Sequence, residues 1–378
     1  MTPISVHKLI NEDHELHGIS RADVVAPSGS YIRREPRIVG TEFLSNPDQH
    51  KDIVSSTNQI YPTVFRIELA GAMVAGQGTV VTRSGRLLSE SAAEFLNHNT
   101  APDGFEGNDN ELCLIKQPVD HIDRPSLLVK RPWWRNYGHW LVDGAALLTL
   151  IPAVRIPADI QIVIGAHESK GMRSVMYDTL AKLAPNIPIV EQPDTATWTF
   201  SNLHYITPVH VPPLFKLPVS REILRAAFLR DEPVSEQHRR IYVSRDPQAG
   251  RAIENEREII DICLSRGLGI LHPEQYAIQE QASIFHDCDI VVGVKGAGLT
   301  NAIFAPNSLG MLVLSPGTFN DPFFWDLAGQ CNMDYTEIFG PVVAPLRSAG
   351  ANNFQIIASV FASELDLLIE RTARKKLR

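Results

Sequence analysis

The sequence predicts an α/β protein built from two doubly wound units, and two observations support this. From residue 130 onward, apolar runs of strand length alternate with amphipathic runs of helix length. A proline-rich stretch, residues 207–220, interrupts the alternation, which then restarts. Alternation at this spacing is typical of a parallel sheet with helices on both faces.

The elements of the first unit follow residue 130. Apolar periodicity indicates helices over residues 139–154 and 174–184, and buried strands over 159–166 and 187–192. Ahead of them, residues 1–130 contain short β-like runs between polar turns. This part predicts hairpins or a small mixed sheet.

The second unit begins after the proline-rich stretch, which we interpret as a semi-rigid linker. A surface loop within one domain is the alternative. We expect an N-terminal domain over residues 1–210, a C-terminal domain over 211–355, and a helix over 356–378 that packs back on the N-terminal domain. Two doubly wound domains leave a cleft at the carboxyl ends of their strands. The predicted strands of the second unit are 239–245, 268–274, 289–294 and 310–316, and its helices are 221–230, 255–267, 277–288, 298–305 and 354–376.

The charge and the cysteine content argue against several classes of function. The net charge is −8, from 35 basic and 43 acidic residues, which predicts no nucleic-acid partner. The four cysteines form no CxxC pair and suit neither a zinc site nor a disulfide framework, so we expect a reducing, cytoplasmic setting. We expect no signal peptide and no membrane span. The basic C-terminal tail fits a solvated helix end, with peripheral contact to an anionic membrane face as the alternative.

A glycine turn follows the strand that ends at Val294. Gly296 and Gly298 allow a tight turn, and the free N–H groups of the next helix favour anions. Lys295 adds a positive charge, so the turn, with Ala297 between its glycines, suits a diphosphate. The spacing matches neither GxGxxG nor a Walker loop, and glycines that serve packing alone are the alternative.

A second cluster lies where another strand ends. Ser244, Arg245 and Arg251 lie at or just past that end, and arginine side chains suit phosphate oxygens. Asn255 and Glu256 open the following helix and are expected to cap it or to hold an arginine. The alternative is a solvated loop with local ion pairs.

The third cluster lies in the first unit. His139 and Asp143 are four residues apart and share one face of a helix, where a carboxylate can orient an imidazole as a general base requires. A structural histidine is the alternative. The aromatic residues that surround them, which fit sugar stacking or a core, are Trp133, Trp134, Tyr137 and Trp140.

Taken in order, these segments resemble glycosyltransferase family 61. "NYGHWLVDGAALL" resembles its Asn-x-x-His helix, "IYVSRDPQAGRAIENEREI" its Ser-Arg…Arg…Asn-Glu segment, and "VVGVKGAGLTNAIFAP" its His-Gly-Ala-x-Leu-Thr-Asn turn. "PFFWDLAGQCNMDY" is similar to its trailing segment. The resemblance covers roughly residues 130–340.

The resemblance implies a GT-B fold, with two Rossmann-like domains facing across a cleft. The N-terminal domain would hold a glycan or glycoconjugate acceptor, and the C-terminal domain a nucleotide sugar, with no cofactor and no obligatory metal. His139 or Asp143 would deprotonate the acceptor, and the side chains that would bind it are Trp134, Asn136 and Tyr137. The residues that would bind the donor diphosphate are Ser244, Arg245, Arg251, Asn255, Glu256, Lys295, Gly296, Ala297 and Gly298.

Two departures from the family pattern stand out. The family usually has histidine at the position of Lys295. It also tends to have a glutamate in the strand after the turn, which would hold a ribose, whereas residues 310–316 contain no acid. The main hypothesis is an inverting sugar-nucleotide-dependent glycosyltransferase of surface polysaccharide assembly. The alternatives are a non-catalytic GT-B-shaped partner protein and a sugar-nucleotide epimerase-like enzyme.

Overall fold

The structure is a computed structural model, and it describes residues 1–376 apart from 13, 98, 109–110, 212–214, 230–238, 247 and 249. The chain forms two compact units. Unit 1 consists of Met1–Gly29 and Tyr61–Leu224, and unit 2 of Ser30–Ile60 and Arg225–Arg378. The α/β class is confirmed. The N-terminal segment 30–60 belongs to unit 2, which the sequence did not indicate.

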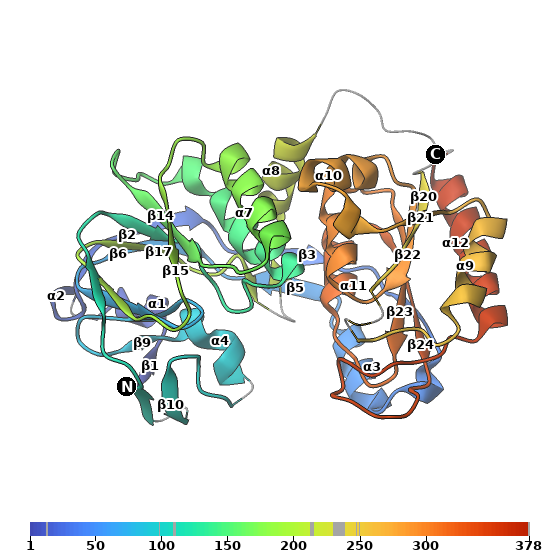
Figure 1. Ribbon diagram of the computed structural model, residues 1–378, viewed down its shortest axis with the longest axis horizontal. Coiled ribbons are helices and arrows are strands. Elements are labelled where there is room, and N and C mark those ends of the chain that lie inside the picture. Colours follow the sequence, from blue (N-terminus) through green and yellow to red (C-terminus); the bar gives the residue numbers. More distant parts are fainter. Residues whose placement is uncertain are drawn as a thin grey trace. The chain divides into compact units, whose positions relative to one another are not determined.

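Unit 1 is built on two six-stranded sheets (Figure 1). In the first, four neighbouring strands are parallel: β15 (Ile189–Gln192), β14 (Gln161–Gly165), β13 (Ser126–Leu128) and β17 (Leu203–Ile206). The sequence predicted β14 and β15, but not β13 and β17. Two antiparallel strands, β6 (Val64–Leu69) and β2 (Ile19–Ala26), extend it. The unit therefore has a mixed sheet where the alternation predicted a parallel one, because residues before 130 supply its last two strands.

The second sheet of unit 1 confirms the β-rich N-terminal region. Its strands, in order, are β1 (Pro3–Ile4), β9 (Leu87–Leu88), β8 (Thr79–Val81), β7 (Ala72–Ala75), β16 (Trp198–Phe200) and β12 (Asp120–Ile122). One apolar core draws on both sheets, since it joins Val74 and Val80 to Leu128 and Val163. Burial of this shared core is what makes the unit one folded body.

Short elements complete the N-terminal part of the chain. The helices are α1 (Val6–Leu9), α2 (His14–His17), α3 (Pro47–Ser55), α4 (Ser89–Asn97) and α7 (Lys170–Leu183), with 3₁₀ turns η1 (Thr41–Phe43) and η3 (Ile151–Ala153). The two-stranded sheets are β3 (Gly29–Ile32) with β5 (Asn58–Tyr61), β10 (Phe105–Asn108) with β11 (Glu111–Leu114), and β18 (His210–Val211) with β19 (Phe215–Lys216).

Unit 2 contains the predicted parallel sheet. Its order is β21 (Gly269–Leu271), β20 (Arg240–Val243), β22 (Ile290–Val294), β23 (Gly310–Pro316), β24 (Asp334–Gly340) and β4 (Arg37–Val39). Every pairing is parallel, and β4 comes from the N-terminal segment. The helices are α8 (Pro218–Phe228), which spans the unit boundary, α9 (Glu256–Ser265), α10 (Ile278–His286), α11 (Phe323–Gln330) and α12 (Ala358–Lys376), with 3₁₀ segments η6 (Pro273–Gln275) and η7 (Ala297–Phe304).

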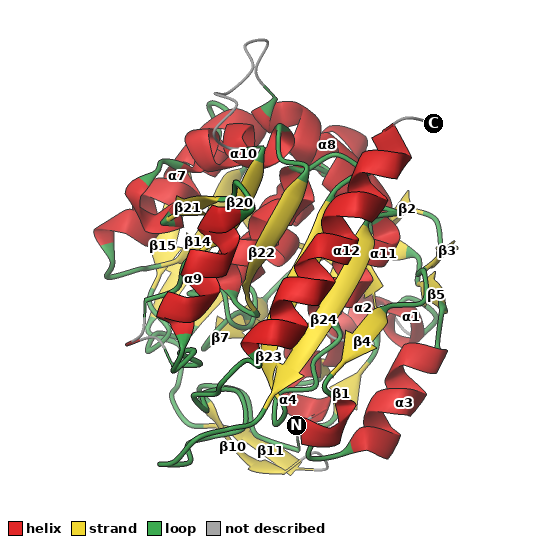
Figure 2. Cartoon of the chain, turned by 90° about the vertical axis from the view of Figure 1, so that its right-hand side faces the viewer, coloured by secondary structure: helices red, strands yellow, loops and turns green. Residues whose placement is uncertain are grey.

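The C-terminal helix packs on the sheet of unit 2. Figure 2 shows α12 lying across the strands of the unit 2 sheet, beside α9. Phe361, Leu365 and Leu368 belong to the core that also contains Val292 and Leu312. The apolar face of the helix therefore completes the core of unit 2. Among the described residues, no helix is long and apolar enough to span a bilayer.

The proline-rich stretch also differs from the prediction. Its described residues form β18, β19 and the start of α8, and the side chains of His210 and Lys216 are buried. Residues 212–214 lie outside the described part. The unit boundary falls at Leu224, later than the expected 210. Packing of the histidine and lysine side chains places this stretch within unit 1.

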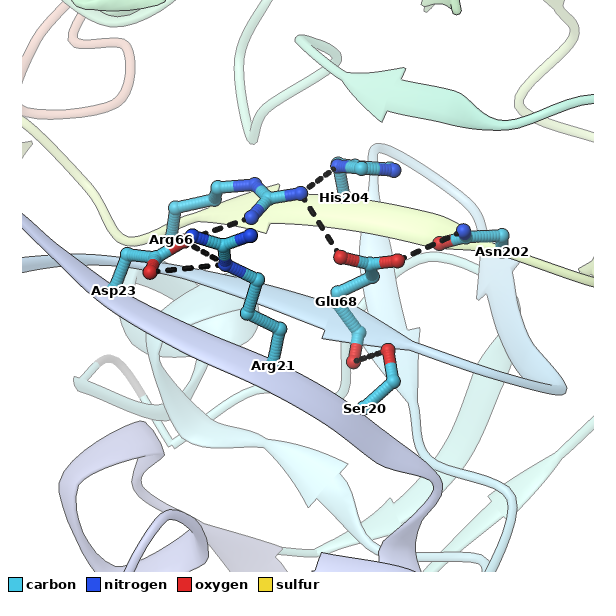
Figure 3. A network of polar contacts seen from close by, with 7 residues as sticks. All are labelled: Ser20, Arg21, Asp23, Arg66, Glu68, Asn202 and His204. Carbon is cyan, nitrogen blue, oxygen red and sulfur yellow. Dashed lines mark hydrogen bonds and ion pairs between the residues drawn. The ribbon is translucent and has the colours of Figure 1, made fainter. Parts of the chain in front are cut away.

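A buried polar network lies within the first sheet of unit 1 (Figure 3). Arg66 donates to Asp23 at 2.8 Å and to Glu68 at 3.0 Å. The imidazole Nδ1 of His204 lies 2.6 Å from the same guanidinium. Because Arg66 is only 1% exposed, these partners compensate the burial of its charge.

Candidate functional site

Asn136 starts the helix that carries the predicted base. Its Oδ1 accepts from the backbone N–H groups of Gly138 at 2.8 Å and His139 at 3.4 Å, so Asn136 is an N-cap. The helix runs as α5 (Tyr137–His139), a π-helical turn η2 (Trp140–Ala145) and α6 (Ala146–Leu148). π-Helical turns are rare in proteins overall, but those that occur are frequently found at functional sites.

Asp143, in this π-helical turn, joins two imidazoles. One carboxylate oxygen lies 3.1 Å from Nδ1 of His139 and the other lies 2.9 Å from Nδ1 of His210. The side chain of His139 is 25% exposed, whereas those of Asp143 and His210 are 9% and 1% exposed. His139 is therefore the member of this cluster that a ligand can reach most easily.

The protonation of the cluster follows from these contacts. Burial by itself would raise the pKa of the Asp143 carboxyl. His210 and His139, which donate to the carboxylate, together lower that pKa by more than burial raises it, so the carboxyl stays anionic. Burial lowers the pKa of His210, although Asp143 opposes the shift. A neutral His139 that donates from Nδ1 carries its lone pair on Nε2, the arrangement of a general base.

A pocket in unit 1 adjoins the cluster. The residues that line it are Glu90, Ala93, Glu94, Arg131, Pro132, Asp143, Pro208, His210 and Val211. Helix α4 provides Glu90, Ala93 and Glu94, and the segment after β13 provides Arg131 and Pro132. Burial lowers the pKa of the Arg131 guanidinium, which stays charged at neutral pH.

The cluster also meets a geometric condition for a divalent metal. One ligand atom from each of His139, Asp143 and His210 can be chosen so that all lie within 4.8 Å of one another. Two imidazoles and a carboxylate suit zinc or a similar ion. Each Asp143 oxygen, however, faces a different imidazole, and two hydrogen bonds explain this arrangement without a metal.

The predicted acceptor residues have different surroundings. Trp134 is 2% exposed, and its indole N–H lies 3.2 Å from an oxygen of Asp194. Trp134 is therefore a core residue, which corrects its predicted contact with the acceptor. Asn136 caps the helix and Tyr137 is half-buried. The exposed tryptophan of this segment is Trp133, at 48%.

In unit 2 the structure brings together Arg245 and the glycine turn. The Arg245 Nε–H donates to the carbonyl of Gly250 at 2.8 Å. A Cβ added to Gly296 would lie 2.3 Å from Arg245 Nη1, so a side chain at this position would displace the end of the guanidinium. Ser244, in the same segment, is half-buried, and its backbone N–H donates to Leu271.

Arg251 lies beside Arg245. Its guanidinium is 4.8 Å from the ring of Phe319, and its backbone is left-handed, with φ of 58°. Burial, with the charge of Arg245, lowers the pKa of Arg251 to about 10. Among the described residues Arg251 makes no ion pair. Two neighbouring cations that repel each other, one of them in a strained conformation, are typical of an anion site.

The turn itself leads into the predicted helix, which is a 3₁₀ helix. Ala297 and Gly298, both half-buried, begin η7. Asn301 supports the turn, because its side-chain amide donates to the carbonyl of Gly298 at 3.1 Å and to Gln281 at 2.7 Å. The backbone N–H groups at the start of this helix therefore lie next to Arg245, which contacts Gly296.

Lys295 has a different position from the one predicted. It is 1% exposed, and its Nζ lies 2.5 Å from an oxygen of Glu337. Nζ also donates to the carbonyls of Asp321 at 2.7 Å and Phe319 at 3.4 Å. An ammonium group has three N–H donors, and these three contacts account for all of them. Its predicted contact with phosphate therefore does not fit this structure.

Asn255 and Glu256 also have structural partners. The Asn255 amide donates to the carbonyl of Ile356 at 2.8 Å, and its oxygen accepts from the backbone N–H of the same residue. Glu256 accepts from the hydroxyl of Tyr242 at 2.9 Å. In the described contacts neither residue binds an arginine. Their hydrogen bonds instead join the start of α9 to β20 and to Ile356.

The family model Glycosyltransferase 61 matches residues 137–312. Over this segment the chain belongs to glycosyltransferase family 61. The family indicates glycosyltransferase activity, with donor and acceptor substrates. The match includes the three residues of the His–Asp–His cluster, both arginines and the glycine turn. No curated protein matches the chain.

Two residues of these sites, His210 and Glu337, were not identified from the sequence, although each had a signal. His210 follows β17, which pairs with β13 in parallel, so the segments after both strands leave the same sheet edge. Glu337 is an acid inside a buried strand, β24, and such an acid requires a partner. The hydroxyls of Ser315 and Tyr335 also donate to Glu337, at 2.6 and 2.7 Å.

Proposed function

We propose that this family 61 protein is an inverting glycosyltransferase. It would transfer a sugar from a nucleoside diphosphate sugar to a hydroxyl of a glycan or glycoconjugate, in the assembly of a surface polysaccharide in the cytoplasm. The proposal includes a GT-B arrangement, with the acceptor bound by unit 1 and the donor by unit 2. One observation carries it: the Arg245–Arg251 pair beside the glycine turn in unit 2.

In this proposal, residues of unit 1 activate the acceptor and residues of unit 2 stabilise the leaving group. The acceptor oxygen attacks the anomeric carbon of the donor and gives its proton to Nε2 of His139, while Asp143 and His210 hold that imidazole in position. The bond between the anomeric carbon and the diphosphate breaks, and the diphosphate leaves with the electron pair. Arg245, Arg251 and the N–H groups at the start of η7 stabilise its charge. Attack opposite to the leaving group inverts the anomeric configuration.

The donor site is tested by thermal shift. UDP, ADP, GDP, CDP and inorganic pyrophosphate are each added to the wild-type protein and to Arg251→Met. A ligand present at 100 times its Kd stabilises the native state by about 2.7 kcal/mol, so at least one of the five should raise Tm in the wild type. If none does so at millimolar concentration, the donor-site proposal fails.

A non-catalytic partner protein remains the second candidate, because Glu337 neutralises Lys295. Turnover distinguishes the two. Release of nucleoside diphosphate from a sugar nucleotide that depends on a glycan acceptor supports the transferase. Binding without turnover, with any acceptor in the panel, supports the partner protein. Epimerisation without acceptor supports the epimerase-like alternative.

A further inference from the structure

Trp133 combines a left-handed backbone with an exposed side chain. Its backbone is left-handed, with φ of 60°, which is a strained conformation for a bulky residue. Its ring is nevertheless not in a core, because the residue is 48% exposed. Burial of an aromatic ring would stabilise the fold. Folding energetics alone therefore do not explain a tryptophan at this position.

The chain fixes the conformation of Trp133 from several sides. The backbone N–H donates to the side-chain oxygen of Gln77 at 2.7 Å, and Gln77 in turn donates to Asp103 at 2.6 Å. The carbonyl of Trp133 accepts from the N–H of Asn136 at 2.8 Å. Its ring stacks on Phe95, with centroids 6.2 Å apart and an angle of 23° between planes. These contacts hold the ring stacked on Phe95, while about half of the residue's surface stays exposed.

This stack lies next to the pocket of unit 1. Pro132, which precedes Trp133, and Glu94, which precedes Phe95, both line the pocket that contains Asp143 and His210. The stack and the pocket therefore share the same two chain segments. A ligand in the pocket therefore contacts the two chain segments that also carry this stack.

We infer that Trp133 is the platform on which a pyranose ring of the acceptor stacks. The inference rests on the proposed transferase function and adds to it the residue that contacts the acceptor sugar and the ring form of that sugar. One face of a pyranose carries C–H groups that match a flat aromatic surface, while its hydroxyls project sideways and bind polar groups. In the pocket, Glu94 and Arg131 offer such groups.

The experiment is saturation-transfer NMR on the full chain. The probes are methyl glucoside, galactoside, mannoside and xyloside in their pyranose forms, and sorbitol is the control because it has hydroxyls but no rigid C–H face. In the wild type and in Trp133→Phe, we expect saturation of the ring C–H protons of at least one pyranoside. In Trp133→Ala and Trp133→Gly the signal should fall at least five-fold. Sorbitol should give no signal in any of them.

Stability separates this role from simple packing. Glycine adopts positive φ readily, so Trp133→Gly should melt at or above Trp133→Ala while binding no pyranoside. If the ring serves only to pack on Phe95, Trp133→Ala lowers Tm and leaves the pyranoside signals unchanged, which overturns the inference. Absence of any pyranoside signal in the wild type also overturns it. The thermal shift with diphosphates tests unit 2 independently, so failure of the transferase proposal is recognised separately.

Discussion

Lys295 and Glu337 form a buried ion pair that spans three neighbouring strands of unit 2. Lys295 directly follows β22 and Glu337 lies in β24, while the strand between them contributes Ser315, which donates to the same carboxylate. The ammonium group also holds the carbonyls of Phe319 and Asp321. The lysine in the glycine turn thus anchors the segment whose phenylalanine lies under Arg251.

The first prediction concerns this pair. Lys295→Met leaves Glu337 buried without its cation, and we expect a loss of about 3–5 kcal/mol in the free energy of unfolding. Glu337→Gln alone should be destabilising in the same way. The double variant removes both charges and should be more stable than Lys295→Met. Urea unfolding measures all three, and additive losses in the double variant would contradict the pairing.

The second prediction separates Lys295 from the arginines. The double variant Lys295→Met/Glu337→Gln should bind inorganic pyrophosphate within about three-fold of the wild type, because Lys295 does not reach the ligand. Arg251→Met should lose at least about ten-fold in affinity, the usual effect of a charge-assisted contact. Titration calorimetry gives both values. Arg257→Met, on an 87% exposed side chain of α9, is the control and should bind normally.

The third prediction concerns the His–Asp–His cluster. His139→Ala should lower kcat by about 10²–10⁴-fold, the usual contribution of a general base, while the thermal shift with diphosphates persists. Asp143→Asn should lower kcat as well, because it removes the anion that orients His139. His210→Gln should have a smaller effect, since His210 acts through Asp143. Wild-type rates in the His139 variant would exclude it as the base.

The fourth prediction concerns metal. Since each Asp143 oxygen faces a different imidazole, we expect activity to survive dialysis against EDTA unchanged. Elemental analysis of the dialysed protein confirms removal of any ion. Loss of activity that Zn²⁺ or Mn²⁺ restores, and that His210→Gln makes unrestorable, would instead identify the cluster as a metal site.

The fifth prediction concerns pH and the network in Figure 3. Burial, together with the charge of Arg66, lowers the pKa of His204 from 6.5 to about 4, although Glu68 opposes the shift. Between these values the unfolded chain binds a proton that the native chain does not, so stability rises with pH. Lowering the pH from 7 to 4 should therefore cost on the order of 2–3 kcal/mol at this residue.

Urea unfolding at pH 7, 6, 5 and 4 measures this dependence. His204→Gln keeps a polar side chain but has no group that titrates in this range, so its stability should change less between pH 7 and 4. An identical pH profile in the variant and the wild type would show that His204 is not responsible.

Much of the fold was predictable because it depends on local pattern. Apolar runs identified β14 and β15 of unit 1, β20–β23 of unit 2 and the helices after residue 130 other than α11, since burial in a sheet or along a helix face leaves such runs. They did not identify β13, β17, β24 or β4. The spacing of His139 and Asp143 predicted their contact for the same reason, because residues four apart lie on one face of a helix.

Contacts between distant segments were not predictable in this way. By itself, the sequence determined the α/β class, the family motifs and the i, i+4 pair, all of which follow from residues close along the chain. The tertiary structure alone decided that residues 30–60 join unit 2, that His210 completes the cluster, that Trp134 is buried while Trp133 is exposed, and that Lys295 binds Glu337. The physical reason is that these outcomes depend on strand order and on the packing of side chains far apart in sequence, which no local period encodes.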